Sequence, residues 1–311
     1  MRFSVIVPLY NKAPYVKKAL SSVLCQTFTD YELIVVNDGS TDDSLTVAKE
    51  ALVGTGARII DQENAGVSVA RNNGVAASVG EYVCFLDADD WWEPTFLERM
   101  NLLIDEFPEA MLWCSNYYYV KNCKPLVKLN IPTGYFNYCR QYSNNLCMPI
   151  WTGAVCIIRE VFDEFGGFVP GLRLGEDFDL WIRIALKYKV AFLNAPLAYY
   201  NQDVDVENRG THNLHKPEHH MLWNLGYLES EERINPDYKQ LVDNLRTYGL
   251  FPYFISKEYH KAAEEQLNKV DWERQKEKWV NLYAQPLWFL RLRNKFLQVG
   301  FRVKQLIISI I

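Results

Sequence analysis

Short apolar runs rich in β-branched residues alternate with helical patterns over roughly the first ninety residues, and this alternation strongly limits the fold. Residues 3–7 form such a run, whereas from Pro14 onward apolar residues recur at three- and four-residue steps. The first pattern is typical of a strand buried on both faces, and the second of an amphipathic helix. The pattern repeats, predicting strands at 3–7, 32–36, 58–60 and 81–86 and helices at 14–24, 44–52 and 67–79. We therefore expect an α/β fold with a Rossmann-like, mainly parallel sheet and helices on both faces.

Polar residues follow three of these strands, at 8–11, 37–39 and 87–89. Ligands of such sheets bind beyond the carboxyl ends of the strands, so these residues are candidates for a site. No glycine-rich dinucleotide fingerprint follows the first strand, and the sequence contains no P-loop pattern. Carboxylates repel a diphosphate unless a divalent cation lies between them. The acidic strand ends therefore favour a site that uses Mg²⁺ or Mn²⁺.

Composition excludes several other classes of protein. The chain has 311 residues and a formal net charge of −5, which argues against nucleic-acid binding. Its seven cysteines include no C-x-x-C pair, so neither a disulfide framework nor a zinc knuckle is expected. Neither a secretory signal nor an apolar run of membrane-spanning length is recognisable. These features predict a cytoplasmic protein that is soluble or peripheral to a membrane.

Several motifs, in order, resemble those of family 2 glycosyltransferases with the GT-A fold. They occur at 4–11, 36–42, 70–72, 86–90, 151–153, 165–168 and 175–181. The resemblance covers about residues 1–200. It implies an inverting, metal-dependent transfer of a sugar, usually from a UDP-sugar, to an acceptor hydroxyl. It also implies a nucleotide-sugar site made by Pro8, Tyr10, Asp38, Arg71, Asp87 and Ala88.

The resemblance also suggests roles for individual residues. Asp38 would accept a hydrogen bond from the uracil edge, and Pro8 and Tyr10 would line the base and ribose pocket. Asp87 would face the ribose. Asp89 would hold Mn²⁺ or Mg²⁺ against the diphosphate, where a cation offsets the charge that develops on the leaving group.

An inverting transfer needs a general base, for which Asp177 is the candidate. Glu176 would either help to bind the acceptor or take that role itself. Both residues open a helix expected at 178–188, whose first amides would orient a carboxylate. A helix start lowers a carboxylate's affinity for protons, so burial has to compensate if one of them is the base. Each acid taken singly could be an ordinary turn or cap residue, whereas the whole set favours a catalytic site.

His212 lies where relatives place a histidine that completes the metal shell. Imidazole can bind Mn²⁺, although oxygen ligands are preferred. The sequence around His212 differs from the usual family motif, and His215, His219 and His220 are close by in the sequence. Three roles stay open for His212: a metal ligand, a residue of an acceptor loop, or an ordinary surface histidine.

The C-terminal third lies outside the family motifs and has a helical pattern. Residues 278–311 contain six basic residues and no acidic one. In the tail 286–311, polar residues recur at three- and four-residue steps among large apolar ones. A basic amphipathic helix of this kind fits an anionic membrane surface. Docking on its own domain, or on a second copy in a homodimer, is the alternative.

Together these observations predict a GT-A domain at 1–205, with a nucleotide-sugar half at 1–115 and an acceptor half at 116–205. A helical region at 206–311 would follow. The expected function is glycosyl transfer to a carbohydrate or lipid-linked acceptor in polysaccharide or glycolipid assembly, at the inner face of the plasma membrane. A sugar nucleotidyltransferase and a non-catalytic, membrane-associated nucleotide-sugar-binding protein are the alternatives.

Overall fold

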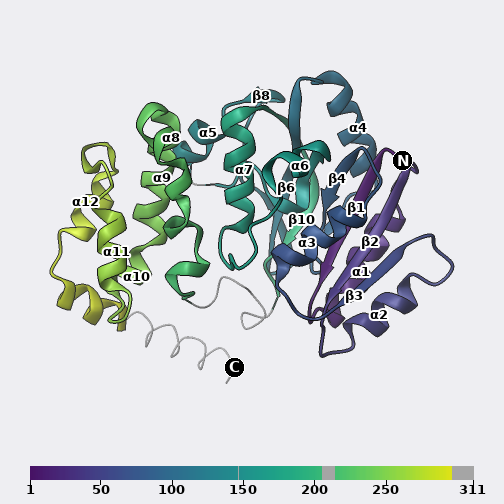
Figure 1. The fold of residues 1–311 in the computed structure, drawn as a ribbon, viewed down its shortest axis with the longest axis horizontal. Coiled ribbons are helices and arrows are strands. Elements are labelled where there is room, and N and C mark those ends of the chain that lie inside the picture. Colours follow the sequence, from purple (N-terminus) through teal and green to yellow (C-terminus); the bar gives the residue numbers. More distant parts are fainter. Residues whose placement is uncertain (146, 205–213, 296–311) are drawn as a thin grey trace. The chain divides into compact units, whose positions relative to one another are not determined.

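The computed structural model describes residues 1–145, 147–204 and 214–295, and the chain divides into two compact units, 1–221 and 222–311. All strands of the described residues belong to the first unit, and the second is helical (Figure 1). The domain boundary expected near residue 205 stays a prediction, as does the division of the first domain at residue 115.

The first unit alternates strands and helices along its amino-terminal part. Each strand and helix expected in the first ninety residues is present, within two residues of its expected bounds. The elements are β1 (Phe3–Leu9), α1 (Ala13–Leu24), β2 (Tyr31–Asp38), α2 (Ser44–Ala51), β3 (Arg58–Gln62), α3 (Val67–Ala77), β4 (Tyr82–Phe85), β5 (Trp91–Trp92), α4 (Phe96–Glu106), β6 (Ala110–Lys121), β7 (Lys124–Val127), β8 (Gly134–Phe136), α5 (Tyr138–Asn145), β9 (Val155–Ile158), α6 (Glu160–Phe165), α7 (Glu176–Lys187) and β10 (Lys189–Asn201).

The strands of the described residues form one sheet, whose main path runs β3-β2-β1-β4-β9-β6-β10-β5. The first four strands of this path are parallel, and Ile6 of β1 lies between Ile34 of β2 and Phe85 of β4. Strand β9 is antiparallel to both β4 and β6, so β6 and its parallel partner β10 run in the same direction as β1. The carboxyl ends of β1, β2, β4 and β10 therefore meet at one edge of the sheet.

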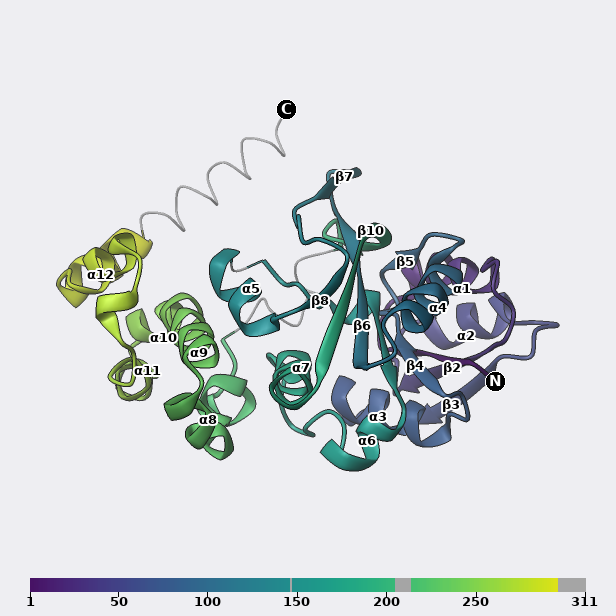
Figure 2. The ribbon, with the colours of Figure 1, turned by 90° about the horizontal axis from the view of Figure 1, so that it is seen from above.

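Helices cover both faces of this sheet, as expected. The chain moves outward from β1 to β3 and then returns to β4 on the other side of β1. Because such crossovers are right-handed, α1 and α2 lie on one face and α3 lies on the other (Figure 2). All residues of β1 are buried, as two covered faces require. The reversal between β1 and β4 is a topological switch point, where open α/β sheets bind ligands.

Helix α3 approaches the sheet closely because Gly74 has no side chain. A Cβ atom at Gly74 would lie 2.4 Å from Cγ2 of Ile6 on β1. Gly74 follows Arg71 by one helical turn, and the buried positions of α3 include both residues. The close packing of this turn therefore fixes the position of Arg71 over the end of β1.

The second unit contains short helices joined by tight turns. They are α8 (Glu229–Ile234), α9 (Pro236–Gly249), α10 (Phe251–Ile255), α11 (His260–Leu267) and α12 (Glu277–Tyr283), followed by helical residues 287–295. Among the described residues, every helix is too short or too polar to cross a lipid bilayer.

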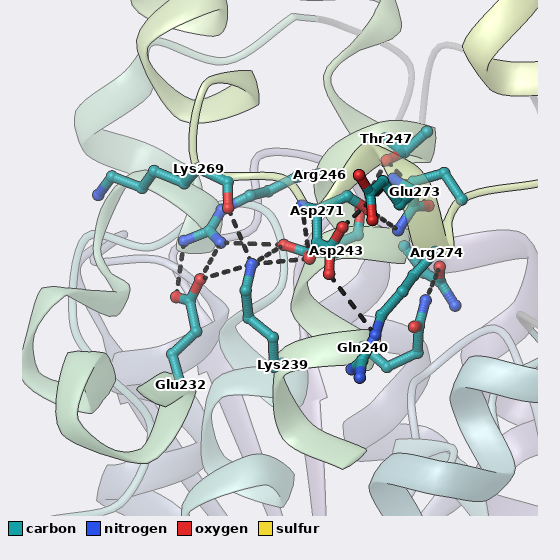
Figure 3. A network of polar contacts seen from close by, with 12 residues as sticks. Glu232, Lys239, Gln240, Asp243, Arg246, Thr247, Lys269, Asp271, Glu273 and Arg274 are labelled. Atoms are coloured by element: carbon teal, nitrogen blue, oxygen red, sulfur yellow. Dashed lines mark hydrogen bonds and ion pairs between the residues drawn. The ribbon is translucent and has the colours of Figure 1, made fainter. Parts of the chain in front are cut away.

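A buried ionic network joins α8, α9 and the segment after α11 (Figure 3). Asp243, 1% exposed, accepts hydrogen bonds from Lys239 Nζ at 2.6 and 2.7 Å and from the backbone N–H of Asp271 at 3.0 Å. Arg246 donates to both oxygens of Glu232, at 2.5 and 2.9 Å. Buried charges are tolerated only when each has partners of this kind. The network therefore specifies how these helices pack.

Candidate active site

A cavity of about 830 Å³ lies in the first unit, at the sheet edge where β1, β2, β4 and β10 end. Its wall also includes the loop before α7 and the first turn of that helix. His212 lies outside the described residues. The other predicted site residues all line the cavity: Pro8, Tyr10, Asp38, Arg71, Asp87, Ala88, Asp89, Glu176 and Asp177.

The loops after β1 and β2 are hydrogen-bonded to each other beside this cavity. The backbone N–H of Asn11 donates to Ser40 Oγ at 3.2 Å, and that of Thr41 donates to Asn11 Oδ1 at 2.8 Å. Asn11 has a φ of 50°, a left-handed conformation that asparagine adopts more readily than most residues. These contacts hold the neighbouring Tyr10 ring, which is 46% exposed, at the mouth of the cavity.

Asp38 is 3% exposed, and its carboxylate accepts hydrogen bonds from one side chain and two backbone N–H groups. Its Oδ1 accepts from Gln62 Nε2 at 2.8 Å and from the backbone N–H of Ala65 at 2.9 Å. Among the described residues, its Oδ2 accepts from the backbone N–H of Gly66 alone, at 2.9 Å. A carboxylate oxygen has two acceptor sites, so Oδ2 can still receive one hydrogen bond from a ligand. Asp38 thus combines the ordinary turn role with room for the predicted ligand role.

Three aspartates follow β4 and lie close enough to affect one another. Asp87 accepts from Arg71 Nη2 at 2.8 Å, and Asp89 Oδ2 accepts from Lys12 Nζ at 2.6 Å. The third, Asp90, accepts from a backbone N–H of β10 and does not cap α4. Burial, with the charge of the neighbouring carboxylates, raises the pKa of Asp89 and Asp90. The cluster therefore favours a nearby positive charge.

The donor set fits Mg²⁺ or Mn²⁺. Carboxylate oxygens are the preferred ligands of these ions, which take one or two protein carboxylates and complete their shell with phosphate and water. Asp89 already pairs with a cation, the Lys12 ammonium group. Asp87 lies close enough for its negative charge to raise the pKa of Asp89. Within the described residues, no three His, Cys, Asp or Glu side chains form a complete metal site. A partial protein shell of this kind suits an ion shared with a phosphate ligand.

Arg71 connects this acidic cluster with the start of α7. Its side chain is 4% exposed, and it donates to Asp87 at 2.8 Å and to Glu176 at 3.0 Å. The nearby carboxylates raise its pKa, although burial acts in the opposite direction. Its guanidinium is therefore committed to two carboxylates of the cavity wall, one after β4 and one at the start of α7.

Glu176 and Asp177 occupy the first turn of α7, which begins two residues before the expected helix. Burial raises the pKa of Glu176 to about 7, and the Asp177 carboxylate adds to this effect while Arg71 opposes it. Asp177 Oδ2 accepts from Thr152 Oγ1 at 2.8 Å, and its Oδ1 accepts from the backbone N–H of Phe178 at 2.8 Å. Burial thus offsets the effect of the helix start on Glu176, and hydrogen bonds orient Asp177.

The cavity also contains polar residues that sequence reasoning did not select. Lys12 follows the strand-end motif directly, and Thr152 lies within a motif that was recognised without a role for its hydroxyl. Tyr200 and Asn201 stand at the end of β10, where the same strand-end rule would have found them. The sequence pattern predicts no strand at 189–201, so it does not single these residues out.

Histidines close one side of the cavity. His215 and His219 line it, and His219 Nδ1 lies 2.8 Å from the carbonyl oxygen of Gly171. His220 is 5% exposed, and burial lowers its pKa to about 4. The backbone around His220 pairs with Leu174, two residues before Glu176, and so fixes the loop that leads into α7.

Residues 4–166, more than half of the chain, match the family model for glycosyl transferase family 2. The chain belongs to this family. The glycosyltransferase GlyA of Streptococcus pneumoniae is 43% identical over 118 residues, 38% of this chain and 17% of that protein. The uncharacterized glycosyltransferase YibD of Escherichia coli is 44% identical over 119 residues, 36% of this chain and 35% of that protein. The chain thus spans about a third or less of these relatives.

Solved structures confirm the GT-A fold. Residues 1–349 of Staphylococcus aureus TarS, in complex with UDP-GlcNAc, superpose with a TM-score of 0.69 over 86% of this chain and 79% of theirs, at 19% identity. The mannosyltransferase PcManGT of Pyrobaculum calidifontis, in complex with GDP-Man and Mn²⁺, gives 0.54 over 88% of both chains, at 16% identity. At these identities the likeness concerns the fold alone.

Proposed function

We propose that the chain is an inverting glycosyltransferase that moves a sugar from a UDP-sugar to an acceptor hydroxyl. One observation carries the proposal: a single cavity holds the acidic cluster of Asp87 and Asp89 and the acid pair of Glu176 and Asp177, and Arg71 contacts both Asp87 and Glu176. A diphosphate-bound donor needs the first feature, and activation of an acceptor hydroxyl needs the second. The nucleotide-sugars bound by TarS and PcManGT support this class of donor.

In this mechanism Asp177 acts as the general base. It takes the proton of the acceptor hydroxyl while the hydroxyl oxygen bonds to the anomeric carbon and the bond from that carbon to UDP breaks. The hydrogen bond from Thr152 and the amide of Phe178 hold the carboxylate in position. Arg71 holds Glu176 beside it, so the two carboxylates keep a fixed geometry. Such preorganisation is how a base at a helix start becomes effective.

On the donor side, Asp38 and Tyr10 would bind the nucleoside, and Asp87 would face the ribose. Asp89, with Asp87 nearby, would hold Mn²⁺ or Mg²⁺, which when bound neutralises charge on the diphosphate. Lys12 now forms an ion pair with Asp89 at 2.6 Å. A cation at Asp89 would compete with this ion pair. The role of His212, as ligand, loop residue or surface residue, stays open.

A peripheral position at the inner face of the plasma membrane completes the proposal. The basic excess of residues 278–311 supports it, because each lysine or arginine near an anionic surface contributes about 1 kcal/mol. An enzyme held at this surface would act on a lipid-linked acceptor, as polysaccharide or glycolipid assembly requires.

Calorimetric titration with UDP tests the donor site. Wild type should bind UDP with Mn²⁺ or Mg²⁺ and lose most of this affinity with a chelator, and Asp89→Ala should not bind. Asp163→Ala, which removes an exposed carboxylate on α6, is the matched control and should bind as wild type. Absence of UDP binding under every metal condition would refute the UDP assignment, and GDP would be titrated next.

Turnover of a UDP-sugar panel separates the proposal from its alternatives. A transferase releases UDP, and Asp177→Asn should lower that release at least a hundredfold while UDP binding stays intact. Pyrophosphate as the product would identify a nucleotidyltransferase. Sugar-nucleotide binding with no turnover in wild type, under conditions where UDP binds, would identify a non-catalytic binding protein.

A further inference from the structure

Helical residues 287–295 rest on the second unit by one edge. Leu290 is 1% exposed, and Arg291 donates from Nε to the carbonyl of Ile255 and from Nη2 to that of Ser256, both at 2.9 Å. These carbonyls belong to the end of α10, where a helix leaves acceptors without partners and favours a positive charge. Arg291 therefore anchors this helix through the polar side of its amphipathic pattern.

Large apolar side chains on the opposite side of the same helix face solvent. Trp288 is 68% exposed, Phe289 41% and Leu292 46%. At about 100° per residue these three side chains fall within roughly a third of the helix circumference; we call them the outer face. The helix docks through Leu290 and Arg291, so these three large apolar side chains lie outside the contact with its own unit. Within the part of the chain that the structure describes, the outer face is thus an unpartnered apolar surface.

Basic residues surround the outer face. Arg293 and Lys295 are exposed beside it, and no acidic residue occurs between Lys278 and Lys295. Large apolar side chains bordered by bases match the boundary between lipid headgroups and acyl chains. A second copy of the chain fits less well, because a two-fold interface would place these bases against one another. In the sequence, apolar residues continue from Leu292 at three- and four-residue steps, at 296, 299 and 303.

We propose that the outer face, formed by Trp288, Phe289 and Leu292, docks on an anionic lipid surface, with Arg293 and Lys295 at the headgroups. The inference deepens the proposed peripheral location and rests on it. It names the side chains that would contact the lipid. It also places Arg291 on the side of the helix that contacts the protein, and not on the side that contacts lipid.

Co-sedimentation of the full chain with lipid vesicles tests this assignment. Wild type should bind vesicles of phosphatidylcholine with 30% phosphatidylglycerol and bind pure phosphatidylcholine weakly. The triple variant Trp288→Ser/Phe289→Ser/Leu292→Ser should lower partitioning at least tenfold. Arg293→Gln/Lys295→Gln should lower it by about fivefold for each charge removed, with the remaining binding less sensitive to salt.

A matched control removes equally exposed apolar groups elsewhere on the same unit. Tyr227→Ser/Ile234→Ser/Tyr248→Ser, at sites 53%, 74% and 60% exposed, should partition as wild type. UDP titration of every variant keeps this test separate from the proposed reaction, since none of these residues lines the cavity. Unchanged vesicle binding by the outer-face variant, or no vesicle binding by wild type, would overturn the assignment. A wild-type dimer that the outer-face variant makes monomeric, without lipid binding, would also overturn it and identify a second copy as the partner.

Discussion

Arg71 and Glu176, 105 residues apart in the chain, meet at 3.0 Å between a guanidinium nitrogen and a carboxylate oxygen. The same guanidinium binds Asp87 at 2.8 Å, so one buried cation contacts both the acidic cluster after β4 and the first turn of α7. Even with this partner, burial and the charge of Asp177 keep the pKa of Glu176 raised to about 7. Ionised Glu176 is thus held in the folded protein at a cost.

This cost predicts that Glu176→Gln stabilises the protein at alkaline pH. The ordinary pKa of Glu176 is 4.5, so the unfolded chain releases the proton first, and wild type loses stability as the pH rises from 4.5 to about 7. Glutamine cannot ionise. The variant should exceed wild type by about 2–3 kcal/mol at pH 8 and equal it near pH 4.5, measured by urea unfolding. Glu160→Gln, at an exposed site on α6, should show no such dependence on pH. Equal stabilities at pH 8 would mean that burial does not destabilise the Glu176 carboxylate.

Thr152 orients the proposed base, so its hydroxyl should matter for turnover more than for donor binding. Thr152 is 1% exposed and donates to Asp177 Oδ2 at 2.8 Å. Thr152→Val removes this hydrogen bond to a charged group, which contributes about 1.5–3 kcal/mol. We expect kcat to fall by about ten- to a hundredfold with the KM for the UDP-sugar unchanged, in steady-state assays of UDP release. Thr152→Ser should restore most of the rate. A rise in KM alone would move Thr152 to the donor site.

The amino-terminal fold could be predicted because its signals are local. Strands such as β1 are buried throughout and read as continuous apolar runs, and α1 buries residues spaced as its sequence pattern predicts. The carboxylates after β4 were likewise visible as polar residues at a strand end. The long pairing of β6 with β10 joins residues about 80 positions apart in the chain. No local sequence pattern predicts it, because the partner of each strand is distant in the sequence.

Partners within the site could not be predicted, for the same reason. Lys12 pairs with Asp89 across 77 residues, and Thr152 reaches Asp177 across 25. Neither spacing corresponds to a local structural period, so only the folded chain reveals these contacts. The tail illustrates the same limit. Its periodicity indicated an amphipathic helix, but only tertiary contacts of Arg291 determine which side faces the protein.

Asp243 should be essential for the stability of the second unit. It is 1% exposed and accepts from Lys239 and from the backbone of Asp271. Asp243→Asn removes the charge of a buried carboxylate that pairs with Lys239 at 2.6 Å and with Arg246 at 3.5 Å, and breaking a buried ion pair costs about 3–5 kcal/mol. Hydrogen exchange of the α9 peptides, read by mass spectrometry, should accelerate accordingly.

The control for Asp243 is an ion pair on the surface. Arg233→Gln breaks a contact with Glu229 at 3.5 Å, in which the arginine side chain is 77% exposed. Such pairs contribute less than about 1 kcal/mol, so exchange in α9 should stay at the wild-type rate. Equal protection in Asp243→Asn and wild type would show that the network contributes little to the stability of this unit.

Gly74 connects core packing with the site, because it sets how closely α3, and with it Arg71, approaches β1. A Cβ atom at Gly74 would lie 2.4 Å from Ile6 Cγ2. Gly74→Ala should therefore destabilise the protein by about 1–3 kcal/mol in urea unfolding, despite the helix preference of alanine. The shift of α3 should also raise the KM for the UDP-sugar. Gly56→Ala, at a glycine with open space around its Cβ position, should change stability by less than about 0.5 kcal/mol. A stabilised Gly74→Ala variant with normal KM would mean that the sheet yields at Ile6 and that Arg71 does not depend on this contact.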